Sequence, residues 1–318
     1  MTIGSLVAAI LLAPPASASP TIGLAWLLFL GSSVHVAATG WLYTVPEVRA
    51  HVLEHRARYV WVPAGLVVGG AAVAAIVPPR LFVWVLLPYS AWQFFHFQKQ
   101  NVGMASLAAS SHRLTSLRKP ERSAILAAGW AGIAGVMSHP GLLRLSANPG
   151  LGRLFPVAGL AFAMAVTFGV WAILRRPSTE RPAGFSAVYI SSLLFSVPIF
   201  LFTSPYAAVG GMILAHGLQY LVLVGLVAAG VPTRRTRLLQ CTTLVNIALI
   251  GGLVLAATSH LHGSGPAGRL LYGAYLGVAM SHFVVDAGIW RLRDTFPRQF
   301  LSSRVPYLVP ARSRRSPA

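Results

Sequence analysis

Four histidines lie inside long apolar stretches of this sequence, where ionisable side chains are rare. They are His35, His96, His216 and His282. An ionisable residue within a membrane-spanning helix is costly and usually faces the interior of the helical bundle. Imidazole is also the side chain that most often binds metals in proteins. The four histidines therefore predict one shared metal site inside a membrane protein.

Two of these histidines are followed by a polar residue one helical turn further along the chain. Tyr220 comes four positions after His216, and Asp286 comes four positions after His282. Residues at this spacing lie on one face of a helix. A metal-bound imidazole normally donates its other N–H to a carboxylate, a carbonyl or a similar acceptor. We therefore expect Asp286 to be a metal ligand or the partner of a liganding histidine, and Tyr220 to act in catalysis beside it.

The other two histidines have similar neighbours. Thr39 follows His35 by four positions, and Gln100 follows His96 by four positions. The helical spacing again places each pair on one face. We expect Gln100 to take part in catalysis by orienting water, oxygen or a ligand. The polar stretch WQFFHFQKQN, residues 92–101, is thus interpreted as one wall of a buried polar site.

The ligand types narrow the choice of metal. Imidazole groups with one carboxylate suit iron, copper or zinc. The single cysteine, Cys241, excludes an intrachain disulfide and a cysteine-based metal cluster. Dioxygen chemistry on oily substrates commonly uses iron, so iron is the expected cofactor, with zinc, copper and haem as alternatives. Aromatic residues suited to an apolar substrate lie near the histidines in the sequence: Trp41, Phe94, Phe95, Phe97 and Phe283.

The composition indicates which elements position these residues. Hydrophobic residues make up 55% of the chain, charged residues 10%, and the mean hydropathy is +0.67. About a quarter of the residues of a soluble domain are charged. Apolar runs near the length that crosses a bilayer recur throughout. The sequence predicts an all-α polytopic membrane bundle of about nine (eight to ten) transmembrane helices, forming one domain over residues 21–293. The predicted spans are 21–43, 58–77, 80–104, 122–138, 154–174, 184–202, 204–229, 237–258 and 269–291.

The distribution of Lys and Arg predicts how the bundle lies in the membrane. The net charge is +19, and loops after odd-numbered spans carry more basic residues than loops after even-numbered spans. Basic loops of membrane proteins face the cytoplasm. We therefore predict a multi-pass protein of the cell membrane, with its N-terminus outside, its C-terminus in the cytoplasm and anionic lipids at its basic loops. This explanation is favoured over nucleic-acid binding. It also puts the four histidines at similar depth on co-directional spans.

The two ends of the chain lie outside the predicted bundle. Pro14, Pro15 and Pro20 predict that the lead-in, residues 1–20, is extended rather than helical. The composition of residues 294–318 predicts a basic and disordered cytoplasmic tail.

A second group of acids and histidines lies between the first two spans. Glu47, His51, Glu54 and His55 are spaced so that several share one face of a short helix. The pattern is compatible with a second metal site, but it favours a solvated amphipathic face.

Four segments, SVHVAATGWLY, FFHFQKQNVG, LAHGLQYLVL and MSHFVVDAGIWRLR, resemble the histidine segments of the Brp/Blh-type β-carotene 15,15'-dioxygenases. The resemblance implies a polytopic membrane fold, intramembrane histidines that hold iron, and central cleavage of β-carotene with oxygen to give retinal. Two positions depart from the pattern. Val-Ala-Ala-Thr follows His35 where the family has Gly-Ala-Leu-Asp, and Tyr220 stands where the family has a second histidine. The resemblance thus implies the metal-site architecture more strongly than the substrate.

These observations predict a membrane-bound, non-haem iron oxygenase that acts with O2 on an apolar isoprenoid, carotenoid or other lipid. Two alternatives stay open. One is a haem-binding membrane protein in which pairs of histidines are axial ligands. The other is a proton-coupled transporter in which His282 and Asp286 form a relay.

Overall fold

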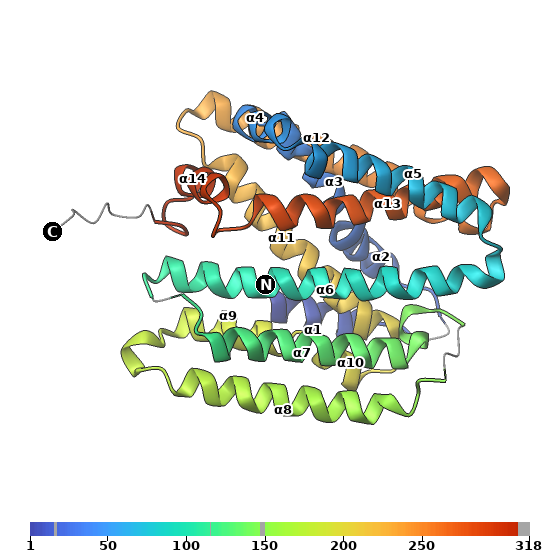
Figure 1. Cartoon of the computed structure of the whole chain (residues 1–318), viewed down its shortest axis with the longest axis horizontal. Coiled ribbons are helices and arrows are strands. Elements are labelled where there is room, and N and C mark those ends of the chain that lie inside the picture. Colours follow the sequence, from blue (N-terminus) through green and yellow to red (C-terminus); the bar gives the residue numbers. More distant parts are fainter. Residues whose placement is uncertain (16–17, 115, 147–149, 311–318) are drawn as a thin grey trace.

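The computed structural model describes residues 1–15, 18–114, 116–146 and 150–310. Within these ranges all regular elements are helices, and the long helices run side by side along the longest axis (Figure 1). The predicted all-α class is confirmed. Six helical segments of the described chain are long and apolar enough to cross a membrane, so the predicted count of about nine is not confirmed. They are Ile22–Thr44, Ala57–Ile76, Gly152–Leu174, Tyr206–Ala229, Arg234–Gly263 and Gly265–Ile289.

The remaining predicted spans are helical but differ from those six. Helix α6 (Pro79–Ser111) has 33 residues and carries the polar stretch at residues 92–101 in its interior. Helix α7 (Lys119–Ser138) begins with charged residues. The span predicted at 184–202 is wrong as one helix, because the chain forms α9 (Ala183–Leu193) and α10 (Val197–Leu201). Pro198 lies in the first turn of α10, a position that tolerates its missing N–H.

The first membrane-length segment is irregular around His35. It begins as α2 (Ile22–Phe29), widens into the π-helical turn η1 (Leu30–Val34), returns to α3 (His35–Ala38) and tightens into the 3-10 turn η2 (Thr39–Thr44). Such π-helical turns occur frequently at functional sites. The other long helices are α5 (Val62–Ile76), α8 (Leu154–Leu174), α11 (Gly211–Ala229), α12 (Arg234–Ser259) and α13 (Gly265–Ile289). The short connecting elements are α4 (Pro46–Glu54), η3 (Ala57–Trp61), η4 (Pro140–Leu143), η5 (Ser178–Glu180), η6 (Tyr206–Gly210) and η7 (Leu261–Gly263).

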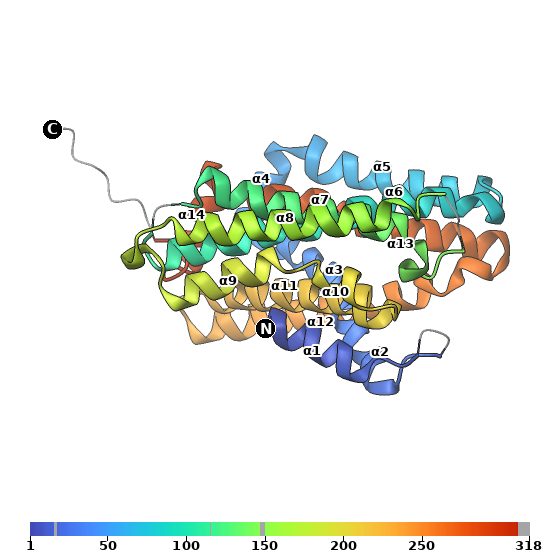
Figure 2. The ribbon, with the colours of Figure 1, turned by 90° about the horizontal axis from the view of Figure 1, so that it is seen from below.

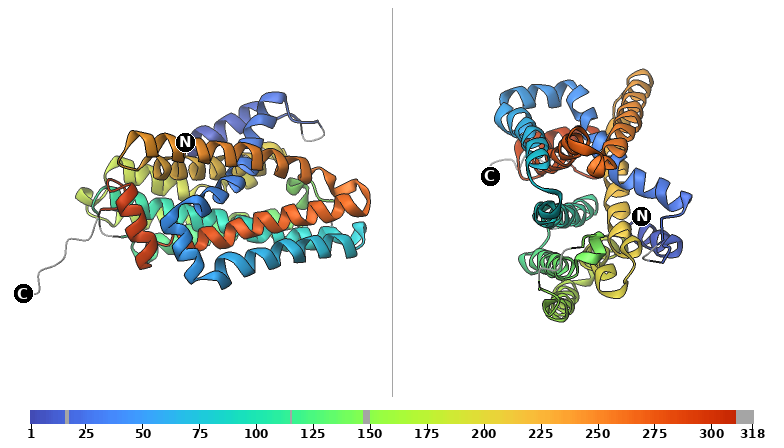
Figure 3. Two further views of the ribbon diagram at one scale, coloured as in Figure 1. Left: turned by 90° about the horizontal axis from the view of Figure 1, so that it is seen from above. Right: turned by 90° about the vertical axis from the view of Figure 1, so that its right-hand side faces the viewer.

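Both ends of the chain contain helices that the sequence did not predict. Helix α1 (Thr2–Leu12) packs against α11 on the flank of the bundle (Figure 2). The expectation of an extended lead-in is wrong there, because Pro14 and Pro15 follow the helix instead of interrupting it. Helix α14 (Thr295–Arg304) lies across one end of the bundle (Figure 3) and buries Leu301 against it. The predicted disorder is therefore wrong for residues 295–310, and residues 311–318 lie outside the described ranges.

Glycines allow two helix pairs to approach closely. A Cβ at Gly273 or Gly277 of α13 would collide with the backbone of α5 around Gly70. A Cβ at Gly217 of α11 would collide with the backbone of Gly31 in η1. Small residues at helix contacts let membrane helices pack backbone to backbone. The second contact brings the segment that carries His35 directly against the helix that carries His216.

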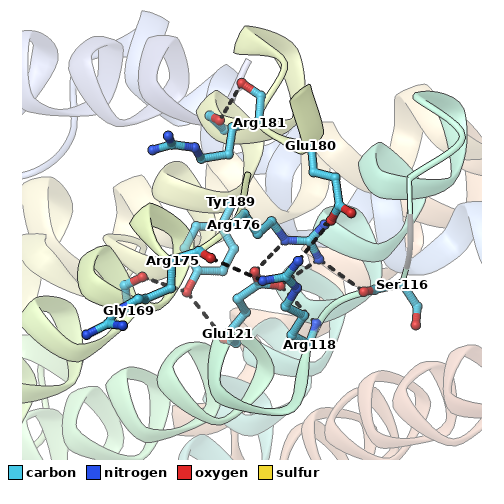
Figure 4. Close-up of polar contacts among 10 residues, drawn as sticks. Ser116, Arg118, Glu121, Gly169, Arg175, Arg176, Glu180, Arg181 and Tyr189 are labelled. Atoms are coloured by element: carbon cyan, nitrogen blue, oxygen red, sulfur yellow. Dashed lines mark hydrogen bonds and ion pairs between the residues drawn. The ribbon is translucent and has the colours of Figure 1, made fainter. Parts of the chain in front are cut away.

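Seen end-on, α6 lies between α13 on one side and α7 on the other, and α8 packs against α7 (Figure 3). A buried ion pair connects α7 to the end of α8. The Arg176 guanidinium donates two hydrogen bonds to the Glu121 carboxylate, one of 2.8 Å from Nη2, and a third of 3.0 Å to the Ser116 carbonyl (Figure 4). Both side chains of the pair are fully buried. Arg176 follows the predicted span 154–174, in a loop whose basic residues were expected to face anionic lipid. It is instead part of the packed interior.

Removing one member of this pair should destabilise the fold strongly. Arg176→Met leaves the buried Glu121 carboxylate without its main counter-charge, and breaking a buried pair in this way costs about 3–5 kcal/mol. Thermal unfolding in detergent, followed by tryptophan fluorescence, should show a clearly lower midpoint. The double variant Glu121→Leu/Arg176→Met should recover much of the loss. The matched control is Arg175→Met, because Arg175 lies over the Trp171 ring and is exposed. Equal midpoints for Arg176→Met and Arg175→Met would contradict a stabilising role for the pair.

Candidate metal centre

The four span histidines come from four different parts of the bundle. His35 is the first residue of α3, directly after the π-helical turn, and His96 lies near the middle of α6. His216 lies on α11 and His282 on α13. All four side chains are buried. The prediction that they face the interior of the bundle is therefore confirmed.

The imidazole rings form a closed ring of neighbours. The centroids of neighbouring imidazole rings are 5.0 Å apart in each of four pairs. The pairs are His35 and His216, His216 and His96, His96 and His282, and His282 and His35. Across this ring, the His216 and His282 centroids are 6.3 Å apart. The four residues singled out in the sequence therefore surround one small space.

Several nitrogens in this cluster lack a hydrogen-bond partner within the described part of the chain. They are Nδ1 of His35, Nε2 of His96, Nε2 of His282 and both ring nitrogens of His216. A buried polar atom without a partner costs about 1–3 kcal/mol. Neutral imidazole nitrogens that meet in one place are suitable ligands for a cation. The cluster thus fits a metal ion that would bind one nitrogen of each of several of these rings.

Two groups of three residues have their ligand atoms within 4.8 Å of one another: His35, His216 and His282, and His96, His282 and Asp286. In the second group, the Asp286 Oδ2 lies 3.6 Å from Nε2 of His282 and 3.8 Å from Nε2 of His96. Ligands at about 2.1 Å from one ion are themselves about 3.0–3.4 Å apart, so these separations fit after small side-chain adjustments. Since His282 belongs to both groups, its position is central to either way of binding an ion.

Hydrogen bonds around the cluster determine which atoms of His282 and Asp286 remain available to bind an ion. The Thr39 hydroxyl lies 2.6 Å from Nδ1 of His282 and 2.8 Å from the Tyr220 hydroxyl. The contact with Thr39 occupies Nδ1 of His282 and leaves Nε2 as the ring nitrogen available to bind an ion. Both groups of three ligands would therefore use the same His282 nitrogen. The Trp290 indole donates a 3.1 Å hydrogen bond to Oδ1 of Asp286. Such partners of metal ligands hold them in the orientation needed for binding. The sequence spacing had linked Thr39 only to His35 and gave no role to Trp290.

Gln100 lies beside the site, but its hydrogen bonds go to the backbone of His216 and to Gln219. Its amide nitrogen donates to the His216 carbonyl and to the Gln219 side chain, both at 3.0 Å. Gln219 in turn donates to the Thr2 hydroxyl at 2.7 Å. This chain of hydrogen bonds ties α6 to α11 and α11 to α1. It gives Gln100 a structural role that the sequence did not indicate.

Aromatic rings cover part of the cluster. Phe97 stacks on His216 with ring centroids 4.1 Å apart, and Phe283 stacks on His96 at 4.5 Å. These contacts hold both imidazoles in defined orientations. Next to the cluster lies a cavity of about 620 Å³, whose inner end is lined by His96, Tyr220 and Asp286. The aromatic residues that the sequence suggested for an apolar substrate do not line this cavity, and several of its other lining residues are basic.

The second candidate cluster lies on α4, outside the spans. The ligand atoms of His51, Glu54 and His55 also lie within 4.8 Å of one another, but Glu54 and His55 are exposed. Partial burial, together with the nearby His55, lowers the pKa of His51. The His51 ring stacks on Phe296 of α14, with centroids 4.1 Å apart. His51 therefore joins α4 to α14, while Glu54 and His55 stay at the surface.

Comparisons with models of known protein families, with curated proteins and with solved structures find no match to this chain. The resemblance to the β-carotene dioxygenases consequently rests on the four histidine segments alone.

Removing His282 should affect metal binding most, because both ligand groups use it. We expect His282→Ala to purify with little bound metal, as measured by mass spectrometry of the metal content after reconstitution. Thr39→Val removes the hydrogen bond that fixes the His282 ring and should weaken metal affinity by about 10–100-fold. His260→Ala is the matched control, since His260 is exposed and bonds to the backbone of its own helix. A thermal melt of each variant separates loss of metal from loss of fold. Full metal content in His282→Ala would contradict the site.

Proposed function

We propose that the protein is a membrane-bound, metal-dependent oxygenase that uses non-haem iron and O2 on a lipid-soluble substrate. One observation carries the proposal. His96, His282 and Asp286 bring two imidazoles and one carboxylate together, and two of these residues, His96 and Asp286, line a cavity. Two histidines and one carboxylate on one side of an ion, with positions left open, are typical of non-haem iron oxygenases.

The residues around the site support this chemistry in separate ways. Asp286 would supply the negative charge to a bound metal, and the Trp290 indole donates a hydrogen bond to its other carboxylate oxygen. Thr39 connects Tyr220 to His282, so the phenol can hold or pass a proton through the threonine hydroxyl. Iron held by this set would supply the activation of dioxygen. Burial of all three candidate ligands limits access of water to the reacting groups.

The two alternatives fit these contacts less well. A haem with two axial histidines needs its flat ring between the two imidazoles. Here each imidazole has two others with centroids at 5.0 Å, which leaves no such gap. A proton relay through His282 and Asp286 needs access from both sides of the membrane, whereas the cavity reaches Asp286 together with residues at the α14 end of the bundle. The oxygenase is therefore the function that we favour.

Iron-dependent oxygen chemistry should depend on Asp286 far more than on an acid outside the site. We expect Asp286→Asn and His96→Ala to lose at least about two orders of magnitude in oxygen uptake after anaerobic loading with Fe(II). Asp294→Asn should keep most of the activity, because Asp294 pairs with Arg291 and Arg293 near the surface. Lipid profiles of carotenoid-producing cells that express each variant would identify a product.

Three outcomes would argue against the proposal. A Soret band in the absorption spectrum of the purified protein would indicate haem. Equal, small effects of Asp286→Asn and Asp294→Asn would remove the carboxylate from the site. A metal-free protein whose expression leaves the lipids of the cell unchanged would favour the transporter.

A further inference from the structure

The cavity beside the metal centre has two chemically different parts. Its inner end is formed by the candidate ligands His96 and Asp286. Its outer part is lined by five basic side chains that come from α6, α7, α14 and the segment after α13: Lys99, Arg122, Arg291, Arg293 and Arg298. Like charges that converge from four elements repel one another. Such an arrangement favours a bound anion.

The protein has too few acids to neutralise this group. Of its six acidic residues, Asp286 lines the cavity as a candidate metal ligand, and Asp294 lies 3.6 Å from Arg291 and 3.8 Å from Arg293. No carboxylate lies within 4.0 Å of Lys99, Arg122 or Arg298 in the described ranges, and the sequence outside those ranges contains no acid. Three cations at the cavity are thus left without a counter-charge.

Three of the other acids are engaged elsewhere. Glu121 and Glu180 bind Arg176, and Glu180 also binds Arg118. Glu47 accepts a 2.8 Å hydrogen bond from Arg304. Glu54 is exposed on α4. None of these four acids forms an ion pair with the basic side chains that line the cavity, so the positive charge there is not neutralised by them.

The rest of the cavity wall is largely apolar. Leu107 of α6, Leu223 of α11 and Leu301 of α14 also line it. A volume of about 620 Å³ holds roughly twenty groups of the size of a water molecule, each of which occupies about 30 Å³. This is in the range of ligand pockets and suits one hydrocarbon chain with a head group. A carotenoid has no charged group for the basic part and would extend beyond the cavity.

We propose that the substrate is an anionic amphiphile, a single-chain lipid that ends in a carboxylate or a phosphate. Its head group binds at Lys99, Arg122 and Arg298, its first carbons lie beside His96 and Asp286, and the rest of its chain lies along the leucines. Lys99 is three residues, and so about 4.5 Å along the helix axis, from His96. The carbons that reach the metal centre are therefore those close to the head group rather than those at the far end of the chain. Only the oxidation of the bound lipid rests on the proposed function; its binding does not.

Binding can be tested without the oxygenase chemistry. The full-length protein, freed of metal with a chelator in a neutral detergent, is titrated with radiolabelled oleate or oleyl phosphate. Oleyl alcohol serves as the neutral compound with the same chain, and acetate or inorganic phosphate as the head group alone. Micelles without protein correct for partitioning. We expect at least tenfold tighter binding of the two anionic lipids than of the alcohol, weakening as salt is added.

Substitutions locate the head group. Arg122→Gln/Arg298→Gln should reduce oleate binding at least tenfold and leave binding of oleyl alcohol unchanged. Arg122→Lys/Arg298→Lys, which keeps both charges, should retain most of the binding. Arg175→Gln is the matched control, because Arg175 lies on the Trp171 ring at the end of α8. Equal affinity for oleate and oleyl alcohol, or unchanged oleate binding in the double Gln variant, would overturn the proposal. Phosphate alone binding as tightly as oleyl phosphate would also overturn it and indicate a small soluble anion. Because the protein is metal-free, none of these results depends on whether it is an oxygenase.

Discussion

A polar atom that is buried in an apolar bundle needs a partner, because neither lipid nor hydrocarbon side chains can replace the hydrogen bonds of water. Most buried polar groups of this protein meet that need within the fold. Arg176 uses Glu121, Gln100 uses the backbone of His216, and Asp286 receives a hydrogen bond from Trp290. The imidazole cluster holds the largest group of exceptions in the described chain, since five ring nitrogens of its four histidines have no partner there. A bound cation would satisfy one nitrogen of each of several of these rings.

Helix packing serves the same cluster. Gly31 and Gly217 remove the side chains that would separate η1 from α11, and Gly273 and Gly277 let α13 lie directly on α5. Each of these contacts brings the backbone of a segment that carries a histidine against the backbone of a neighbouring segment. The irregular turns on either side of α3 then set the direction of His35 independently of the helix before it. Close packing of this kind keeps the imidazoles in position without a ligand to hold them together.

The sequence predicted the parts of this structure that follow from local periodicity. The sequence was sufficient to predict the helical class and most helix bounds. It also predicted that His35, His96, His216 and His282 meet, because a polar residue in an apolar helix usually faces the interior of the bundle. Contacts between segments far apart in the sequence could not be predicted. Thr39 is separated from His282 by 243 positions, and nothing in their spacing joins them. The same holds for Glu121 and Arg176, and for the basic side chains around the cavity. Helices α1 and α14 were missed because their stability comes from packing on the bundle rather than from their own composition.

The length of α6 has a consequence for how a lipid would reach the site. Its 33 residues make a helix about 50 Å long, whereas the hydrocarbon core of a bilayer is about 30 Å thick. In a bilayer that α6 crosses, both of its ends would therefore extend to the level of the lipid phosphates. The half of α6 beyond Lys99 lines the basic part of the cavity, which would put that part at the height at which anionic head groups already lie. A lipid entering there would keep its head group in the same plane and draw only its chain sideways into protein, so that binding would not require the lipid to be lifted out of the leaflet.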